Sequence, residues 1–142
     1  MKYINNKVML LLLLSYFSAS IGILNAEPME QSRTVDSSHP RVRLVLGSDD
    51  LYGDIKLVKA RVAPIGNFIR GQASVQNLTD ENYGLEYKFD WYDDEGFIVG
   101  KGGVWQRFML GAREIRSFKS LGKSKNASRM QLTVRVPVDY FD

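Results

Sequence analysis

The chain has 142 residues, which is enough for one domain. Hydrophobic residues make up 44% and charged residues 25%, close to the soluble globular average, which argues against a disordered, collagen-like or polytopic membrane protein. The absence of cysteine excludes disulfides, thiolate metal sites, a cysteine nucleophile and a lipid-modified cysteine. A single histidine, His39, excludes any multi-histidine metal site.

Residues 1–26 have the three-part layout of a secretory signal peptide, with two lysines, an apolar run and a less apolar end. We expect cleavage after Ala26, which makes Glu27 the first residue; cuts after Ser20 or Gly22 are alternatives. An uncleaved membrane anchor is the other possibility, because residues 8–24 are just long enough to span a bilayer.

Removal of the signal changes the charge balance. The signal carries two lysines and no acidic residue, so 17 basic and 16 acidic residues remain, and the net charge falls from +3 to +1. A nucleic-acid-binding domain needs a strong basic excess. We therefore expect no nucleic-acid partner.

Residues 27–40 are polar and lack apolar periodicity, which predicts a flexible tether before a single domain at residues 41–142. The domain contains seven segments rich in β-forming residues. In chain order they are 41–46 (a short edge strand), 55–63, 69–75, 85–91, 104–110, 113–120 and 130–136.

Three of these segments alternate apolar and polar residues, so period two assigns their faces. The predicted inward residues are Leu85, Tyr87, Phe89 and Trp91; Met130, Leu132, Val134 and Val136; and Ile69, Gly71, Ala73 and Val75. Glu86, Lys88 and Asp90 are assigned to the opposite, solvent-facing side. Short strands separated by turn residues at this spacing predict an all-β fold, an antiparallel β-sandwich of about seven strands.

The segment Tyr87 to Phe97 resembles the aromatic strand and following turn of the YcfL-like family. Weaker resemblances are the Asn77-Leu78-Thr79 turn, the strand–turn step Phe108 to Glu114 and the last strand. The resemblance implies an immunoglobulin-like β-sandwich in the envelope of a Gram-negative bacterium, with no known catalytic activity. Many members of the family resemble lipoproteins; this chain has no cysteine, so the resemblance implies a free periplasmic protein here.

Two aromatic residues are candidates for an interaction surface. Tyr92 follows the inward Trp91 and therefore steps to the outer face of its strand. Trp105 is expected in the core, with a binding surface as the alternative. Exposed aromatic side chains can stack on sugar rings or anchor a protein partner.

Acidic residues gather at Asp90, Asp93, Asp94 and Glu95, but without the alternating ligands of a calcium loop. We interpret them as a solvated hairpin turn. No metal, cofactor or catalytic residue is predicted: the chain lacks a Gly-x-Ser-x-Gly motif, and its single histidine lies in the expected tether.

Charge is segregated along the chain. Residues 80–95 hold seven acidic residues and one lysine, whereas residues 96–142 hold nine basic and three acidic residues. Neutralisation between neighbouring strands is one interpretation. The other is a basic surface, with Lys123, Lys125 and Arg129 as its loop residues, that meets an anionic envelope component or an acidic partner.

These observations together predict an exported, periplasmic, non-catalytic interaction module of the cell envelope. An envelope protein is the expected partner, with weak self-association possible and membrane contact only if the signal stays uncleaved. The alternative function is binding of an envelope glycan or another small ligand.

Overall fold

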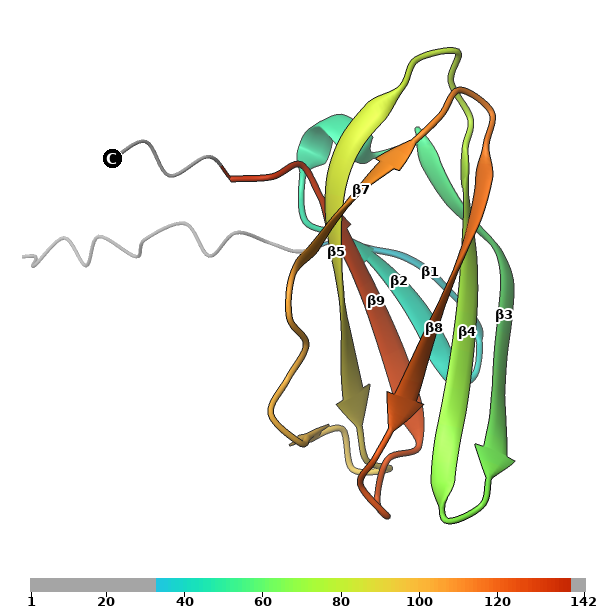
Figure 1. The fold of residues 1–142 in the computed structure, drawn as a ribbon, viewed down its shortest axis with the longest axis vertical. Coiled ribbons are helices and arrows are strands. Elements are labelled where there is room, and N and C mark those ends of the chain that lie inside the picture. The colour runs from blue at the N-terminus through green and yellow to red at the C-terminus, as the bar shows by residue number, and fades with distance from the viewer. Residues whose placement is uncertain (1–32, 139–142) are drawn as a thin grey trace, which may run out of the picture.

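Nine strands and one short 3-10 helix form across residues 33–138, the part of the chain that this computed structural model describes (Figure 1). The elements are β1 (Arg33–His39), β2 (Val42–Leu46), η1 (Asp49–Leu51), β3 (Ile55–Ile65), β4 (Phe68–Asn77), β5 (Tyr83–Tyr92), β6 (Ile98–Val99), β7 (Gln106–Leu110), β8 (Ile115–Gly122) and β9 (Arg129–Arg135). This range contains no helix that is long and apolar enough to cross a membrane.

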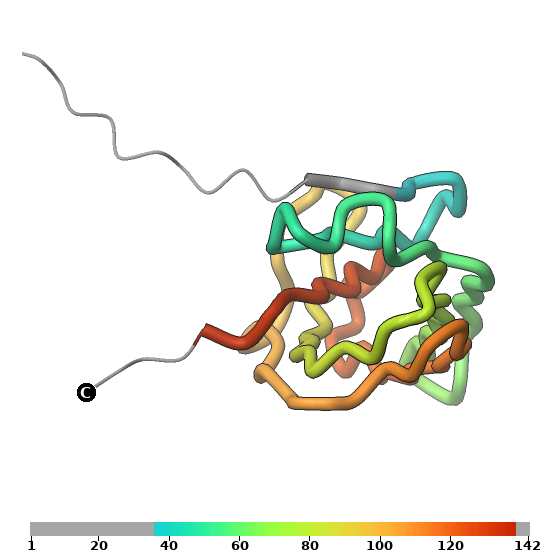
Figure 2. Tube along the Cα trace, turned by 90° about the horizontal axis from the view of Figure 1, so that it is seen from above, coloured from blue at the N-terminus to red at the C-terminus, as the bar shows by residue number. Residues whose placement is uncertain are grey.

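The strands form two sheets packed face to face, so the predicted all-β sandwich is confirmed (Figures 1 and 2). Sheet A has the order β1-β2-β9-β5-β6, and β7 also pairs with β5. Sheet B has the order β3-β4-β8. Neighbouring strands are antiparallel except β2 and β9, which run parallel, with Val42 opposite Met130 and Leu46 opposite Val134.

The core lies between the two sheets, where the predicted inward faces meet. Leu85, Trp91, Leu132 and Val134 are all buried, as period two requires. The Trp91 indole donates a hydrogen bond from Nε1 to Ser120 Oγ at 2.9 Å, which satisfies its one polar atom. Of the predicted inward residues, Val136 differs, because β9 ends before it and its side chain is exposed.

The expected tether at 27–40 is wrong for residues 33–39, which form strand β1 and pair with β2. Consequently β2 lies between β1 and β9 and is not the edge strand that we expected. The polar sequence of β1 hid it, because strand pairing uses backbone N–H and C=O groups and an edge strand needs no apolar side chains.

The outer face of β5 is also not the solvent-facing surface that alternation suggested. Asp90 is only 3% exposed and Glu86 only 8%. The segment 100–105 connects β6 to β7, which both pair with β5 on the edge away from β9, and it runs so close to that edge that a side chain at Gly103 would overlap the backbone of β5. The Gly103 N–H donates to Asp90 Oδ1, and Arg135 pairs with Glu86, so each of these two buried carboxylates has a polar partner.

The same segment ends at Trp105, which we expected in the core and which lies against the outer face of sheet A. The Arg135 guanidinium lies 3.7 Å from the centroid of its ring, and Lys88 Nζ lies 5.2 Å from it. Both distances are typical of cation–π contacts. Trp105 therefore packs against two basic side chains of the sheet and remains partly exposed.

Candidate functional site

A pocket of about 280 Å³ lies where the β1–β2 turn meets the end of β5 and the start of β9. The side chains of Arg41, Arg43, Arg129 and Tyr92 contribute to its lining, and we call it the arginine pocket. His39, the last residue of β1, and Pro40 of the β1–β2 turn also line it. None of the residues that line the pocket is acidic.

Strand alternation and pairing explain how these side chains meet. Arg43 lies between the buried residues Val42 and Leu44, so it projects from the outer face of β2. Tyr92 and Arg129 are direct cross-strand partners on β5 and β9. Because β9 lies between β2 and β5, the outer faces of all three strands form one continuous surface here.

Each basic group of the arginine pocket has a defined contact. Arg41 Nε donates to the Ser128 carbonyl at 2.9 Å. The Arg43 guanidinium lies 5.3 Å from the Tyr92 ring centroid, within cation–π range. Arg129 donates from Nη2 to the backbone carbonyls of Asp93 and Asp94. These contacts orient the arginines, and none of them neutralises a guanidinium charge.

The chemistry of such a pocket is recognition of an anion. Arginine presents several N–H donors in a planar fork that matches a carboxylate or phosphate group. Tyr92 adds an aromatic face and a hydroxyl group beside the three cations. The volume suits one anionic group with a few attached atoms, because pockets for drug-sized ligands begin at about 300 Å³.

The structure brings together two of the five predicted surface residues, Tyr92 and Arg129. Trp105 lies elsewhere on sheet A, as described above. Lys123 and Lys125 lie in the β8–β9 connection and do not line the arginine pocket. Arg129 is the first residue of β9, whereas the two lysines lie in the connection that precedes it.

Sequence reasoning missed Arg41, Arg43 and His39. The first two carry a usable signal, because Arg41-Val42-Arg43-Leu44 alternates basic and apolar residues at the start of a strand. His39 carries none, since it lies in the segment interpreted as a tether.

A second hollow, the inter-sheet groove, opens between β5 and β8 and has a volume of about 570 Å³. Tyr87, Phe89 and Trp91 from the inner face of β5 line it. Lys101, Lys119 and Lys123 are its basic residues, so one of the two predicted lysines does lie beside aromatic side chains. Next to the groove, the Tyr87 ring lies 4.3 Å from that of Phe118, centroid to centroid.

The acidic residues that follow β5 form a turn, as expected. The Asp93 carboxylate accepts a hydrogen bond from the Phe97 backbone N–H at 2.8 Å, and Asp94 and Glu95 are exposed. Across residues 33–138, no group of three or more His, Cys, Asp or Glu side chains is placed to hold a metal ion.

Two ion pairs join the acidic segment of the chain to the basic one. Arg135 Nε lies 2.6 Å from Glu86 Oε1, and Arg113 Nε lies 2.9 Å from Asp80 Oδ1. The Arg113 side chain holds the pKa of the Asp80 carboxyl below its usual range, first through this hydrogen bond and then through its charge. Ion pairs between the two segments therefore neutralise part of the segregated charge.

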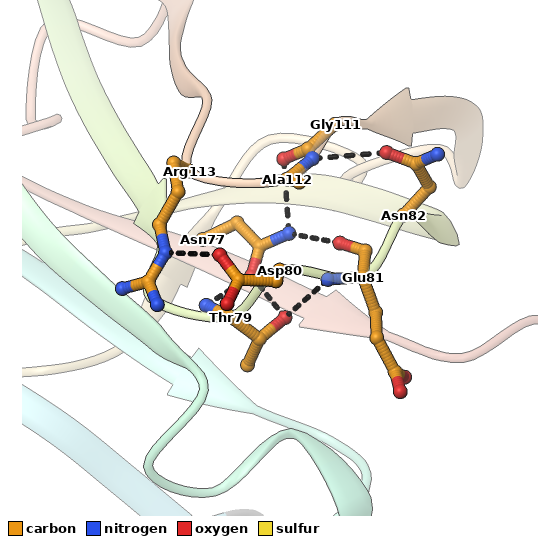
Figure 3. Close-up of polar contacts among 8 residues, drawn as sticks. All are labelled: Asn77, Thr79, Asp80, Glu81, Asn82, Gly111, Ala112 and Arg113. Carbon is orange, nitrogen blue, oxygen red and sulfur yellow. Dashed lines mark hydrogen bonds and ion pairs between the residues drawn. The ribbon is translucent and has the colours of Figure 1, made fainter.

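At the end of the sandwich opposite the arginine pocket, Asn77 is the centre of a polar network and is itself buried (Figure 3). Its Nδ2 donates to the carbonyls of Glu81 at 2.7 Å and Gly111 at 2.9 Å. Its Oδ1 accepts from both the backbone N–H and the hydroxyl group of Thr79. Every polar atom of this amide is satisfied by protein, so we assign it the structural role of holding two turns together.

The sequence profile of a family described as "Protein of unknown function (DUF1425)" matches residues 42–136, from the start of β2 to just beyond β9. The chain belongs to the DUF1425 family. The DUF1425 match includes Arg43, Tyr92 and Arg129 of the arginine pocket, whereas His39 and Arg41 precede it.

Two crystal structures are similar to this DUF1425 protein. One, of a DUF1425 family member from Shewanella sp. pv-4, has a TM-score of 0.54 and 22% identity, covering 65% of this chain and 86% of that one. The other, of cj0090 from Campylobacter jejuni, has a TM-score of 0.55 and 14% identity, covering 66% of this chain and 97% of that one. At these identities the likeness shows a shared fold alone. No curated protein has significant similarity to the chain.

Proposed function

We propose that this DUF1425 protein is an exported, periplasmic, non-catalytic interaction module that binds an anionic group of an envelope protein in its arginine pocket. The observation that carries the proposal is the set of three arginines around Tyr92, with no acidic residue in the lining. A carboxylate or phosphate of a partner would supply the missing negative charge.

Two sequence features support export and the finer family assignment. Residues 1–26, which lie outside the described residues, have the layout of a signal peptide. The aromatic strand and turn from Tyr87 to Phe97 support a YcfL-like protein within the DUF1425 family.

The three arginines of the pocket support binding and not acid–base catalysis. Arginine keeps its proton at physiological pH, so it does not act as a general acid or base there. Arg41 and Arg129 are also held by backbone carbonyls, which fixes their positions. A preorganised set of cations loses little conformational freedom when it binds an anion.

Photocrosslinking in intact cells tests this proposal. A photoreactive amino acid at Ser37, which lines the arginine pocket and is exposed, should give one dominant protein adduct. The double substitution Arg43→Gln with Arg129→Gln should remove the adduct. The matched control, Lys123→Gln with Lys125→Gln, removes the same charge outside the pocket and should leave the adduct in place. Absence of an adduct, or equal loss in both double variants, would show that the pocket is not the binding site.

The inter-sheet groove favours a second candidate function, binding of an envelope glycan. Its aromatic residues offer faces on which sugar rings can stack. Co-sedimentation with isolated peptidoglycan tests it, because Phe89→Ala should lower binding whereas Arg43→Gln should not. If peptidoglycan binds the wild-type protein and both variants equally, the groove is not a glycan site.

A further inference from the structure

Sheet B has an unusual charge composition. Its three strands, β3, β4 and β8, contain no acidic residue and six basic ones. The basic residues are Lys56, Lys59, Arg61, Arg70, Arg116 and Lys119. Of these, Arg116 is paired with Glu114, whose carboxylate lies 2.8 Å from its guanidinium. The remaining cations have no carboxylate on their own sheet.

Strand register places four of these cations together on the outer face of sheet B. Ala73 and Phe118 are buried, so the residues on either side of each point outward. Arg61 lies opposite Gln72, which lies opposite Lys119, and these three residues form one row across the sheet. Lys59 lies in the row on one side and Arg70 in the row on the other.

These four side chains are exposed and have no ion pair with any other residue in the range 33–138. Residues two apart on a strand are separated by about 7 Å, which is within the Debye length of about 8 Å at physiological ionic strength. The cations therefore repel one another through solvent. Arg61, Arg70 and Lys119 also line one shallow depression around Gln72, where their positive potentials add.

One end of this face is apolar. Ile65 and Phe68 are cross-strand partners at the β3–β4 hairpin, whose two-residue turn has Gly66 at a positive φ of 56°. Their side chains are 42% and 45% exposed. Leu121, 40% exposed, lies opposite Arg70 in the adjacent row. This face therefore has an apolar hairpin at one end and the four cations next to it.

We propose that the outer face of sheet B binds the surface of a membrane that contains anionic phospholipids. The cations would lie among the headgroups, and the hairpin with Ile65 and Phe68 would reach the boundary of the acyl chains. Basic residues and exposed apolar residues on one surface are the combination that holds peripheral proteins on anionic bilayers. This face belongs to the other sheet from the arginine pocket, so the proposal is independent of the proposed function.

The apolar hairpin distinguishes a lipid surface from other polyanions. An acidic protein or a nucleic acid would pair with the cations but leave exposed apolar side chains of the hairpin unexplained. The mature chain also has a net charge of only +1, without the general basic excess of nucleic-acid-binding domains. Membrane contact through sheet B does not require the N-terminal segment to remain as an anchor.

Vesicle co-sedimentation tests the proposal, with the protein used as cells export it and its N-terminus determined by mass spectrometry. Vesicles of phosphatidylglycerol with phosphatidylcholine are compared with vesicles of phosphatidylcholine alone. This comparison matters because an uncleaved apolar segment would bind both kinds equally. The wild-type protein should prefer the anionic vesicles, and the preference should shrink as salt is raised.

Three variants locate the binding surface. Arg61→Gln with Arg70→Gln should lower partitioning into anionic vesicles roughly thirtyfold, since each basic residue near the surface contributes about fivefold. Phe68→Ser should lower it roughly tenfold by removing an inserted apolar side chain. The matched control, Arg43→Gln with Arg129→Gln, removes the same charge from sheet A and should retain most of the binding. Urea unfolding checks that all variants remain folded.

Three outcomes would overturn the proposal. One is equal binding of the wild-type protein to neutral and anionic vesicles. Another is an equal loss of binding in the sheet A and sheet B double variants. The third is binding of soluble poly-glutamate, lost in the Arg61/Arg70 variant, without binding to anionic vesicles; this result would assign the face to an acidic protein.

Discussion

Asp90 is expected to be one of the most sensitive charged positions in the protein, although it occupies a polar position of an alternating strand. Its side chain is almost fully buried and has two partners. Oδ1 accepts a hydrogen bond from the Gly103 backbone N–H at 2.8 Å, and Oδ2 lies 3.1 Å from Lys88 Nζ. The substitution Asp90→Ala removes both contacts.

The expected loss of stability follows from the contact that each partner of Asp90 loses. A hydrogen bond to a charged acceptor contributes about 1.5–3 kcal/mol, and Asp90→Ala leaves the Gly103 N–H without this acceptor. Lys88 loses less, because its side chain is partly exposed and can turn toward water. We therefore expect Asp90→Ala to lower the free energy of unfolding by about 2–4 kcal/mol, a large part of the roughly 5–15 kcal/mol typical of a domain.

Urea unfolding followed by tryptophan fluorescence measures this loss. Asp94→Ala is the matched control, because Asp94 is exposed and the same substitution there should change stability by less than about 0.5 kcal/mol. Asp90→Asn should fall between the two, since an amide oxygen can still accept from Gly103. If Asp90→Ala and Asp94→Ala unfold at the same urea concentration, the carboxylate does not hold segment 100–105.

Three other substitutions test separate parts of the fold. Asn77→Ala should cost about 3 kcal/mol in urea unfolding, because it removes all four hydrogen bonds of a fully buried amide and leaves the carbonyls of Glu81 and Gly111 without their donor; a loss below about 1 kcal/mol would contradict this. Gly103→Ala should lower stability by about 1–3 kcal/mol and change Trp105 fluorescence, because the new methyl group overlaps the Phe89 backbone; an unchanged spectrum would contradict the close approach of Gly103 to β5. Glu114→Gln should flatten the acid side of the stability–pH curve. The Gly111 N–H, and then Arg116, hold the pKa of Glu114 below its usual 4.5, so its contribution is present above that value and is lost as pH falls through the folded-state pKa. As pH is lowered, the urea concentration at the unfolding midpoint should fall less steeply for Glu114→Gln than for the wild-type protein. Equal slopes would refute this.

Period-two alternation alone was sufficient to assign the inner face of β5. Leu85 and Trp91 are buried as predicted, because successive side chains of an extended chain point to opposite sides whatever the rest of the protein does. The same reasoning assigned Leu132 and Val134 to the core and placed Tyr92 on the outer face. These properties are local, so they can be read from neighbouring residues.

Contacts between distant segments determine which residues lie against the outer face of each strand. Glu86 and Asp90 are buried beside partners from other segments, Arg135 and the Gly103 N–H, and no pattern within β5 encodes these contacts. Likewise, β1 is a strand because β2 supplies its backbone partners, not because its own residues alternate.

The two proposed binding surfaces depend on pairing between distant segments. Arg43 reaches Tyr92 and Arg129 because β2 runs parallel to β9, which in turn pairs with β5. Arg61 and Lys119 form one row because each lies opposite Gln72 from its own strand. Local sequence patterns predicted seven of the nine strands in residues 33–138 and the direction of many of their side chains. Long-range backbone pairing decided which of those side chains became neighbours, because hydrogen bonds between strands are formed by groups that every residue shares.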